Sequence, residues 1–568
     1  MKMLKPSPTH GRNAFDMSCR DVQSYNIGEL LPVYCLETVP NDKVVIKPAD
    51  LLRACPLVTS PFLRMKQHID FWFVPYQQLW SRWNEFIVER SEPFSSNLFD
   101  KGFVPYFKMA DCISAIKNDV STFSIKNVLG ESYGPDAARL LDSLGYPAHS
   151  LYYNWSQPDN TMVNPFRLAA YQKIWYTEYR QQYYDDGTLG MQQPFTYDTA
   201  VARLFNFDDL GCYSVASADI LGRQIDPTTD YSPFAYLCQL RRRAWKKDLF
   251  TGLMPSTQFG AVSTVSLDSV SLRTSTPSVR GYAVVDPNTN YVVTRDSNGN
   301  IINGTVKQWS VPEAFDVLKL RRSEAIQKWR ENALRAGNFV EDNFEAHYGV
   351  KPRSHMDTHP TFIGSVDAPI NIGDVDVTAT TSASVNGAAG DIAGKALSSI
   401  SGKEFHFQTN DFGVIMGIFS ILPEAEYESL GIDRPNQLLE RFDFFTPEFE
   451  NLGLEAVDYH TMSSDYGNGA LGYAPRYWGY KTKIDKVHLD FFRQHSGTGG
   501  ISMDGVFKQW CSPRLVWPQS TPALKNLYVD YRTFQYNFVT TSVKQFLVDM
   551  YIDCTAVRPM TISGMPSY

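Results

Sequence analysis

The chain lacks closely spaced cysteines. Its eight cysteines are scattered over 568 residues, and no two have the Cys-x-x-Cys spacing of a zinc site or redox motif. A disulfide framework is not indicated either, because small secreted scaffolds that depend on disulfides carry a much denser set. The sequence therefore predicts buried, reduced thiols. They are Cys19, Cys35, Cys55, Cys112, Cys212, Cys238, Cys511 and Cys554.

Long hydrophobic runs are also missing. No stretch approaches the roughly 18 apolar residues that a membrane-spanning helix needs. The first residues, MKMLKPSPTH, lack the apolar core of a secretion signal. We therefore expect no membrane insertion, and a protein that stays in the cytosol where it is made, at least until lysis.

The chain also lacks a surplus of positive charge. Lys and Arg number 53 against 61 Asp and Glu, which gives a formal net charge of -8 at pH 7. A protein that neutralised a genome alone would need an excess of Lys and Arg to displace counterions from phosphates. The balance argues against a free-standing nucleic-acid binder, although a container for nucleic acid remains compatible with it. The 43% of hydrophobic and 14% of aromatic residues predict a folded chain with ample core.

An aromatic strand followed by a tryptophan-rich helix is the most informative local pattern. Alternation over residues 64–75 predicts a strand that Pro75 ends, and residues 78–89 show helical spacing. One face of the strand is strongly apolar, so we expect strand and helix to share one core. That face carries Met65, Ile69, Phe71 and Phe73; the other carries Lys66, His68, Asp70 and Trp72; the helix carries Leu79, Trp83, Phe86 and Ile87.

Two further helices are predicted. The first starts at Asn164 as its N-cap, with Pro165 in the first turn. The second has a capping box formed by Ser310 and Glu313 and ends at Gly337. Their expected buried stripes are Leu168, Tyr171, Trp175 and Tyr179, and Ala325, Ile326, Trp329 and Ala333. A shorter helical pattern lies at 137–144. Strands are predicted at 31–35, 44–46, 404–408, 412–422, 476–484 and 543–552.

Several stretches, in the same order along the chain, resemble the major capsid proteins of Microviridae, closest to the gokushovirus-like and gut branches. None is a catalytic motif, so the specificity of the resemblance lies in their number and collinearity. They are RMKQHIDFWFVPYQQLWSRWNEF, NPFRLAAYQKIW, WKKDLFTGLMP, EAIQKWR, RFDFFTPEFEN, APRYWGYKTKIDKV, FLVDMY and AVRP.

The resemblance implies a mainly β fold: an eight-stranded antiparallel jelly roll of the viral capsid type, with long loop insertions and a few helices. It implies a non-enzymatic major capsid protein that assembles through pentamers into a T=1 icosahedral shell around a circular single-stranded DNA phage genome. Its expected location is the virion, assembled in the bacterial host cytoplasm. Implied partners are further copies of the chain, the packaged DNA, a small basic DNA-packaging protein and other virion or scaffolding proteins. No cofactor and no metal site are expected.

The expected organisation is a single capsid domain, 1–568, because no linker separates compositional blocks. The jelly-roll core is assigned to 25–90, 404–494 and 535–556. Insertions are assigned to 91–163, 184–310, 338–403 and 495–534. Within them, 256–310 is rich in Ser, Thr and Asn turns and is expected to form outward hairpins, an outer protrusion that could contact a host-surface receptor. Residues 374–402 are expected to form a flexible arm.

One basic cluster is a candidate nucleic-acid site. It combines phosphate-seeking charge with a stacking surface and consists of Arg241, Arg242, Arg243, Trp245, Lys246 and Lys247. Single-stranded DNA on an inner wall is one interpretation. The other is a solvated or inter-subunit face that pairs with the excess acids. Arg12, Arg20 and Lys5 are weaker candidates for the same interior role.

Other patterns fall short of a catalytic motif. Residues 389–396 resemble a phosphate loop, but Ala389 and Ala396 stand where Gly and Ser or Thr belong. His355 and His359 lack the Glu of a metalloprotease helix. The alternative function, an all-β carbohydrate-binding protein or glycoside hydrolase, needs a carboxylate pair that no spacing identifies among Glu424, Glu426, Glu428, Glu448 and Glu450. A separate receptor-binding spike is a third possibility.

Overall fold

The structure is a computed structural model. It describes residues 11–80, 83–88, 104, 107–110, 112–113, 133–152, 161–180, 238–258, 282–285, 291–295, 307–308, 317–336, 340–349, 359–376, 392–463, 469–493, 505–513, 528–541 and 543–562. The chain divides into two compact units. Unit 1 comprises Met1–Pro255 and Pro352–Tyr568, and unit 2 comprises Ser256–Lys351.

A four-stranded antiparallel sheet forms one layer of unit 1. Its order is β11-β5-β15-β3, with β3 at Leu31–Thr38, β5 at Met65–Pro75, β11 at Thr361–Pro369 and β15 at Gly413–Pro423. The central strand β15 is buried along nearly its whole length. Its continuous apolar run fits that position, because a strand covered on both faces needs no polar alternation.

A seven-stranded sheet forms the second layer. Its two longest strands, β4 and β20, pair along almost their whole length and alternate between buried and largely exposed residues, so only one face of this sheet meets the core. The strands are β1 Asn13–Asp16, β2 Cys19–Tyr25, β4 Lys43–Ala54, β12 Asn371–Asp376, β13 Ile392–Ile400, β14 Phe405–Gln408 and β20 Phe546–Arg558. The sheet joins both ends of the chain, because β20 pairs with β1 and β2.

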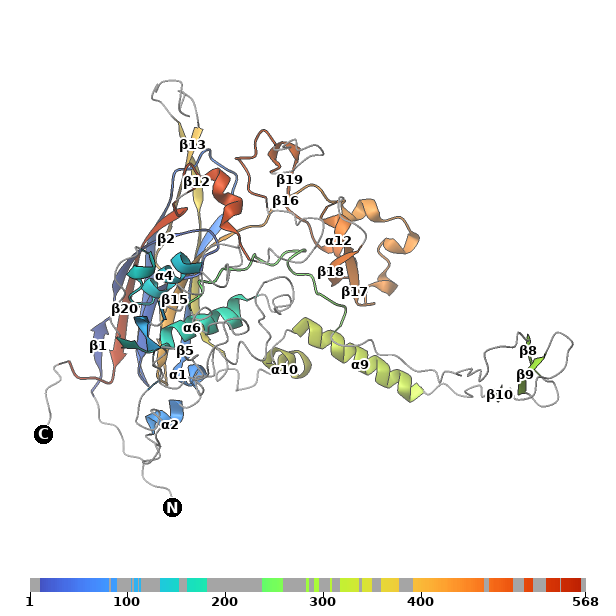
Figure 1. Cartoon of the computed structure of the whole chain (residues 1–568), viewed down its shortest axis with the longest axis horizontal. Helices are drawn as coiled ribbons and strands as arrows, with labels where there is room; N and C mark the ends of the chain where they lie inside the picture. The colour runs from blue at the N-terminus through green and yellow to red at the C-terminus, as the bar shows by residue number, and fades with distance from the viewer. Residues whose placement is uncertain are drawn as a thin grey trace, which may run out of the picture. The chain divides into compact units, whose positions relative to one another are not determined.

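Aromatic rings join the two sheets into a sandwich. Phe71 and Phe73 of β5 contact Phe405 and Phe407 of β14, with ring centroids 5.7 and 5.3 Å apart. Helices α1 (Tyr76–Leu79), α4 (Tyr133–Ser143) and α6 (Phe166–Ile174) contact strands of the four-stranded sheet and lie beside it in Figure 1. The mainly β, antiparallel fold class is confirmed.

The described part of unit 1 also contains smaller elements. The π-helix η2, Trp175–Tyr179, extends α6. Two further helices, α2 and α5, span Trp83–Ile87 and His149–Tyr152. Short pairs are β6 Phe107–Lys108 with β7 Met162–Val163, β16 Tyr427–Glu428 with β19 Lys486–Val487, and β17 Leu454–Asp458 with β18 Ala470–Pro475. The remainder are α12 Trp478–Lys481 and the 3-10 turns η3 Arg434–Gln437, η4 Arg441–Asp443, η5 Pro447–Phe449, η6 Tyr459–Thr461, η7 Leu489–Phe491 and η8 Tyr531–Asn537.

Among its described residues, unit 2 has a three-stranded antiparallel sheet and two helices. The sheet order is β10-β9-β8, with β8 at Tyr282–Val285, β9 at Tyr291–Arg295 and β10 at Lys307–Gln308. The predicted turns at 286–290 and 296–300 lie outside the described residues, but the strands around 286–290 do form the expected antiparallel pair. The helices are α9 Val317–Ala336 and α10 Val340–Tyr348.

The predicted helix after Ser310 exists as α9, but its buried stripe is wrong. Ala333 is buried, whereas Ala325 is exposed and Trp329 is 56% exposed. Trp329 stacks on His347 of α10 with ring centroids 5.4 Å apart, so one side of the indole faces a neighbouring helix rather than a core. Ser310, Glu313 and Gly337 lie outside the described residues.

Three other predictions need correction. The helix at 78–89 is two short helices, because Trp80 after α1 adopts an extended conformation. The strand at 476–484 is wrong: Tyr477 has a left-handed φ of 60° that ends β18, and α12 follows. The described parts of the predicted arm at 374–402 are paired strands rather than a flexible segment, since β12 and β13 form a hairpin. The predicted insertion 338–403 thus supplies β11, β12 and β13 to the two sheets.

Within the described part of the chain, no helix is long and apolar enough to cross a membrane.

Candidate nucleic-acid interface

The segment 241–243 lies between two other parts of the chain and is hydrogen-bonded to both. The Leu30 N–H donates to the Arg241 carbonyl at 3.1 Å, and the Arg243 N–H donates to the Gly28 carbonyl at 2.7 Å. On the other side, the Val529 N–H donates to the Arg243 carbonyl at 2.9 Å. The backbone of the predicted basic cluster is therefore fixed inside unit 1.

Arg241 points into the subunit, where it is only 5% exposed. Its Nε donates to Gln172 Oε1 at 2.7 Å, and its guanidinium lies over the ring of Trp175 at 4.1 Å from the centroid. The hydroxyl of Tyr171 accepts from its backbone N–H at 2.8 Å. All three partners lie on α6 or at the start of η2, so this arginine docks a helix onto the sandwich.

Arg243 reaches the outward side of β5. Its Nη1 donates to Ser420 Oγ at 2.6 Å and lies 3.4 Å from Asp70 Oδ2, which also accepts from the Tyr179 hydroxyl at 2.6 Å. Burial and the neighbouring Asp70 raise the pKa of Tyr179 well above its ordinary value. Both faces of this part of β5 are therefore buried, and the polar face expected from the sequence is covered by η2 and Arg243.

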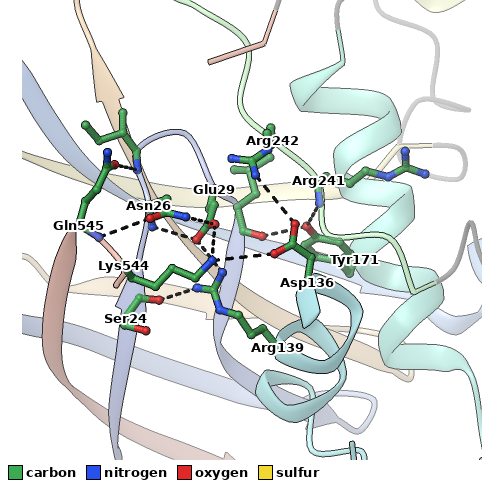
Figure 2. A network of polar contacts seen from close by, with 12 residues as sticks. Ser24, Asn26, Glu29, Asp136, Arg139, Tyr171, Arg241, Arg242, Lys544 and Gln545 are labelled. Carbon is green, nitrogen blue, oxygen red and sulfur yellow. Dashed lines mark hydrogen bonds and ion pairs between the residues drawn. The ribbon is translucent and has the colours of Figure 1, made fainter. Parts of the chain in front are cut away.

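Arg242 belongs to a buried network of charges that Figure 2 shows. Its Nη2 lies 3.9 Å from Asp136 Oδ2, and Lys544 Nζ lies 4.0 Å from Asp136 Oδ1. Glu29 is fully buried. Its Oε2 accepts a hydrogen bond from Arg139 Nη1 at 2.9 Å, and its Oε1 lies 3.5 Å from Lys544 Nζ. The network joins α4 to the chain segments before β3 and before β20.

Glu29 stays ionised in this setting. Burial alone would raise the pKa of its carboxyl group, but the charges of Arg139, Lys544 and Arg242 outweigh burial and hold the pKa at about 2. The N–H and side-chain amide of Asn26 also donate to it, at 2.9 and 3.0 Å. For Asp136, burial and the nearby charge of Glu29 raise the pKa above its usual value. The arrangement therefore pairs the buried carboxylate of Glu29 with cations from three other parts of the chain.

The remaining members of the predicted cluster separate. Trp245 is buried and its ring centroid lies 6.3 Å from that of Phe534, whereas Lys246 and Lys247 are exposed. The structure thus places Arg242 and Arg243 beside carboxylates of the same chain and Arg241 against α6, and it leaves the two lysines at the surface. Nucleic-acid contact by these six residues stays a prediction. Of the weaker candidates, Arg20 forms an exposed pair with Asp549 at 2.8 Å.

Three of the candidate carboxylates contact a cation or a backbone N–H. Glu424 and Glu426 lie 3.1 and 3.6 Å from the guanidinium of Arg64, and Glu428 Oε1 accepts from the Arg493 N–H at 2.8 Å. Burial raises the pKa of Glu426. Across the described residues, no group of three or more His, Cys, Asp and Glu side chains could hold a metal ion. His355 lies outside the described residues.

Comparison with known proteins decides the family. The sequence model of the family described as "Capsid protein (F protein)" matches residues 5–568. The chain belongs to this capsid family. It is similar to "Capsid protein VP1" of Chlamydia phage 1, with 21% identity over 604 residues that cover 99% of this chain and 96% of the relative. It is likewise similar to "Capsid protein VP1" of Bdellovibrio phage phiMH2K, with 20% identity over 605 residues and the same coverage.

The resemblance to Microviridae capsid proteins is therefore confirmed, and this capsid protein is a major structural component of the virion in a family that self-assembles into shells. The sequence did not reveal the network of the capsid protein around Glu29. A single Glu in the apolar run Ile27 to Leu31 was the available signal. Its partners Arg139 and Lys544 are too distant along the chain for any spacing rule to connect them.

Proposed function

We propose that the chain assembles through pentamers into a T=1 icosahedral shell that encloses a circular single-stranded DNA genome, inside the cytoplasm of a bacterial host. The observation that carries the proposal is the capsid-family match over residues 5–568, since it covers almost the whole chain and not one module of it. The chain acts in this proposal as a building block and not as an enzyme.

Exposed apolar side chains support assembly. Leu439, Leu489 and Val506 are 87%, 73% and 86% exposed in the single chain, and several Phe and Tyr side chains are also open to solvent. Contiguous apolar patches on a soluble subunit mark contact surfaces. A shell made of one chain buries such surfaces between identical copies.

Packaging needs a cationic partner in this proposal. The chain carries a net charge of -8, so it cannot neutralise a genome by itself. We propose that a small basic packaging protein supplies most of the neutralising charge and that other virion or scaffolding proteins guide assembly. Lys246 and Lys247 are the exposed members of the basic cluster and would add local contacts with the DNA.

Host contact is proposed for the hairpin region of unit 2. The range 256–310 is the proposed outer protrusion, and the antiparallel pair β8 and β9 lies in it. Surface loops and hairpins tolerate variation, which suits a surface that binds a host receptor.

The test is to express the chain with its virion partners and measure nuclease-protected DNA in the assembled fraction. Closed particles that retain single-stranded DNA after nuclease treatment are expected. A chain that stays monomeric beside its partners and hydrolyses a glycan would refute the proposal and support the glycoside hydrolase alternative.

A further inference from the structure

The outward face of the seven-stranded sheet is open to solvent and carries apolar side chains. Opposite residues of an antiparallel pair point to the same side, so the register places Val22, Leu51 and Leu547 together on this face. Leu397 of β13 joins them, because it pairs with Arg53, which also pairs with Leu547. These four side chains and Tyr551 are all exposed. We call this surface the open sheet face.

One half of the open sheet face is basic. On β4 the outward positions include Lys43, Lys47 and Arg53, and on β13 they include Lys395. Neither strand has an outward carboxylate among the described positions of this face, because the one acid of β4, Asp50, points into the sandwich. Lys47 is paired with the neighbouring Glu404 at 3.1 Å. On the neighbouring strand β20, Asp549 and Asp553 lie opposite Leu51 and Lys47 on the same face. The positive charge of this half is therefore concentrated at Arg53 and Lys395, beside the apolar side chains of Leu397 and Leu547.

A second exposed surface has the opposite charge. Residues 439–452, which we call the aromatic knob, carry four carboxylates against one arginine, Arg441. Their large apolar side chains are strongly exposed at Leu439, Phe442, Phe444 and Leu452. Exposed apolar groups with acidic neighbours make this knob the chemical complement of the open sheet face.

The aromatic knob is held in shape by its own chain. Phe442 meets Phe449 edge to face at 5.3 Å, and Phe445 meets Tyr477 at 5.1 Å. Asp443 accepts from the N–H groups of Leu439 and Glu440 at 2.9 and 2.8 Å, and these hydrogen bonds lower its pKa. A preformed apolar surface binds more tightly because little conformational entropy is lost on contact.

Both surfaces belong to unit 1, and Figure 1 draws them apart. The strands β17 and β18 and the helix α12, which pack beside the knob, lie far from β2 and β20 of the sheet. One chain therefore presents the two complementary surfaces at different places. Contacts of this kind between identical subunits are heterologous, and they form rings when the rotation closes.

We infer that the aromatic knob of one subunit docks on the open sheet face of the next copy of this chain. The inference rests on the proposed shell function and names one of its contacts. A protein occupant fits better than single-stranded DNA, because bases stack on aromatic side chains, whereas the open sheet face presents Leu51, Leu397, Leu547 and Val22 with Tyr551 as its exposed aromatic ring. The acidic knob would itself repel a phosphate backbone.

Photo-crosslinking tests the contact directly. Leu439 is replaced by a benzophenone amino acid, and particles are assembled from a mixture of isotopically light and heavy subunits. Irradiation is expected to join position 439 to peptides from β4, β13 or β20, with light–heavy pairs proving contact between two copies. The matched control places the same amino acid at Val506, which is equally exposed but lies outside the knob; it should not label these strands.

Charge reversal provides a second test. Arg53→Glu with Lys395→Glu should lower the yield of closed particles about tenfold or more, because a like-charge contact disfavours the correct encounter. Glu440→Lys with Glu448→Lys should restore part of the yield when added to that variant. The melting temperature of the unassembled subunit shows whether each variant folds.

The outcomes separate the inference from the function. Particles that form while position 439 labels another region, another virion protein or DNA would overturn the docking and leave the shell intact. Loss of particles in the reversed variant without rescue would also count against the docking if the subunit stays folded. Failure of the unmodified chain to form any particle would instead refute the proposed function.

Discussion

The carboxylate of Glu29 is fully buried among three cations, and its removal should be costly. Glu29→Gln leaves the mostly buried Arg139 and the half-buried Lys544 without this anionic partner. Breaking a buried ion pair from one side typically costs about 3–5 kcal/mol. We expect a loss of that size in the free energy of unfolding, measured by denaturant titration of the unassembled subunit.

The pH dependence of the free energy of unfolding provides a second test of the role of Glu29. Its folded pKa of about 2 lies below the ordinary value of 4.5, so its stabilisation is complete above pH 4.5 and is lost as pH falls toward 2. The Gln variant should lack that part of the acid dependence. Asp549→Asn is the matched control, because the exposed Asp549–Arg20 pair should contribute little. Equal losses in both variants would contradict the account.

Asp50 should behave in the opposite way. Its Oδ1 accepts from the Ile400 N–H at 2.6 Å and from Gln67 Nε2 at 3.2 Å, while the buried Oδ2 has no partner among the described residues. Burial raises its pKa to about 6 from 3.8. The folded state therefore holds the proton more tightly, and the stability of the subunit falls as pH rises from 3.8 to about 6.

Asp50→Asn removes this penalty, because the amide oxygen can accept the same two hydrogen bonds without a charge. At about pH 7.5 we expect a gain on the order of 1–2 kcal/mol in the free energy of unfolding. The gain should shrink at about pH 4. Melting curves at both pH values provide the measurement, and a variant that keeps the pH slope of the parent would refute the assignment to Asp50.

Lys246 and Lys247 allow a test of the predicted DNA contact, because both side chains are exposed and their replacement should leave the fold intact. Replacing both by Ser should lower the packaged DNA content, or its resistance to salt, because each lost phosphate contact reduces counterion release. Lys483→Ser is the surface control, since it removes an exposed cation that is not a candidate for DNA contact. Particles of the double variant with unchanged DNA content and salt resistance would eliminate the proposed DNA role.

The sequence revealed the composition of the basic cluster but not its placement. A run of cations around a tryptophan at 241–247 is compatible both with a nucleic-acid surface and with a buried cluster that holds chain segments together. The difference is set by Gln172, Asp70 and Glu29, which lie far away along the chain and reach the arginines only after folding. Spacing rules cannot anticipate such long-range pairs.

At the scale of elements, the contact between the two sheets depends on a glycine in β11. A Cβ added at Gly364 would lie 2.2 Å from the ring of Phe405 in the opposite sheet, so Gly364→Ala must displace that ring. Overpacking of this kind costs about 1–3 kcal/mol. Gly373→Ala in β12 is the matched control, because nothing lies within 4 Å of its added Cβ.

Denaturant titration should show a clear loss for Gly364→Ala. Gly373→Ala should change stability far less, since its side chain enters open space. If both variants unfold at the same denaturant concentration as the parent, the close approach of β11 and β14 is incorrect.

Regular strands were predictable and irregular segments were not. The alternation in β5 and β20 and the apolar run in β15 follow directly from burial on one face or both. The segment 476–484 was predicted as a strand, but Tyr477 adopts a left-handed conformation and the short helix α12 follows it. In α9 the helical period was right, yet the expected buried stripe includes the exposed Trp329, because periodicity does not say what covers a face.

At the scale of the whole molecule, the fold class and family were available from the sequence because collinear motifs cover nearly the whole chain. Strand pairing was not available, since β20 near the carboxyl end joins β1, β2 and β4 near the amino end. Such non-local pairing makes the sheet depend on the complete chain. The open sheet face became visible only when the register showed which residues share a face, and the aromatic knob only from the exposure of its side chains.

The most direct measurement is a cryo-electron microscopy reconstruction of particles made by this chain with its virion partners. We predict a closed T=1 shell in which unit 1 forms the continuous wall and identical copies bury the exposed apolar surfaces against one another. Single chains or small open oligomers at high concentration, with those surfaces still facing solvent, would contradict the account.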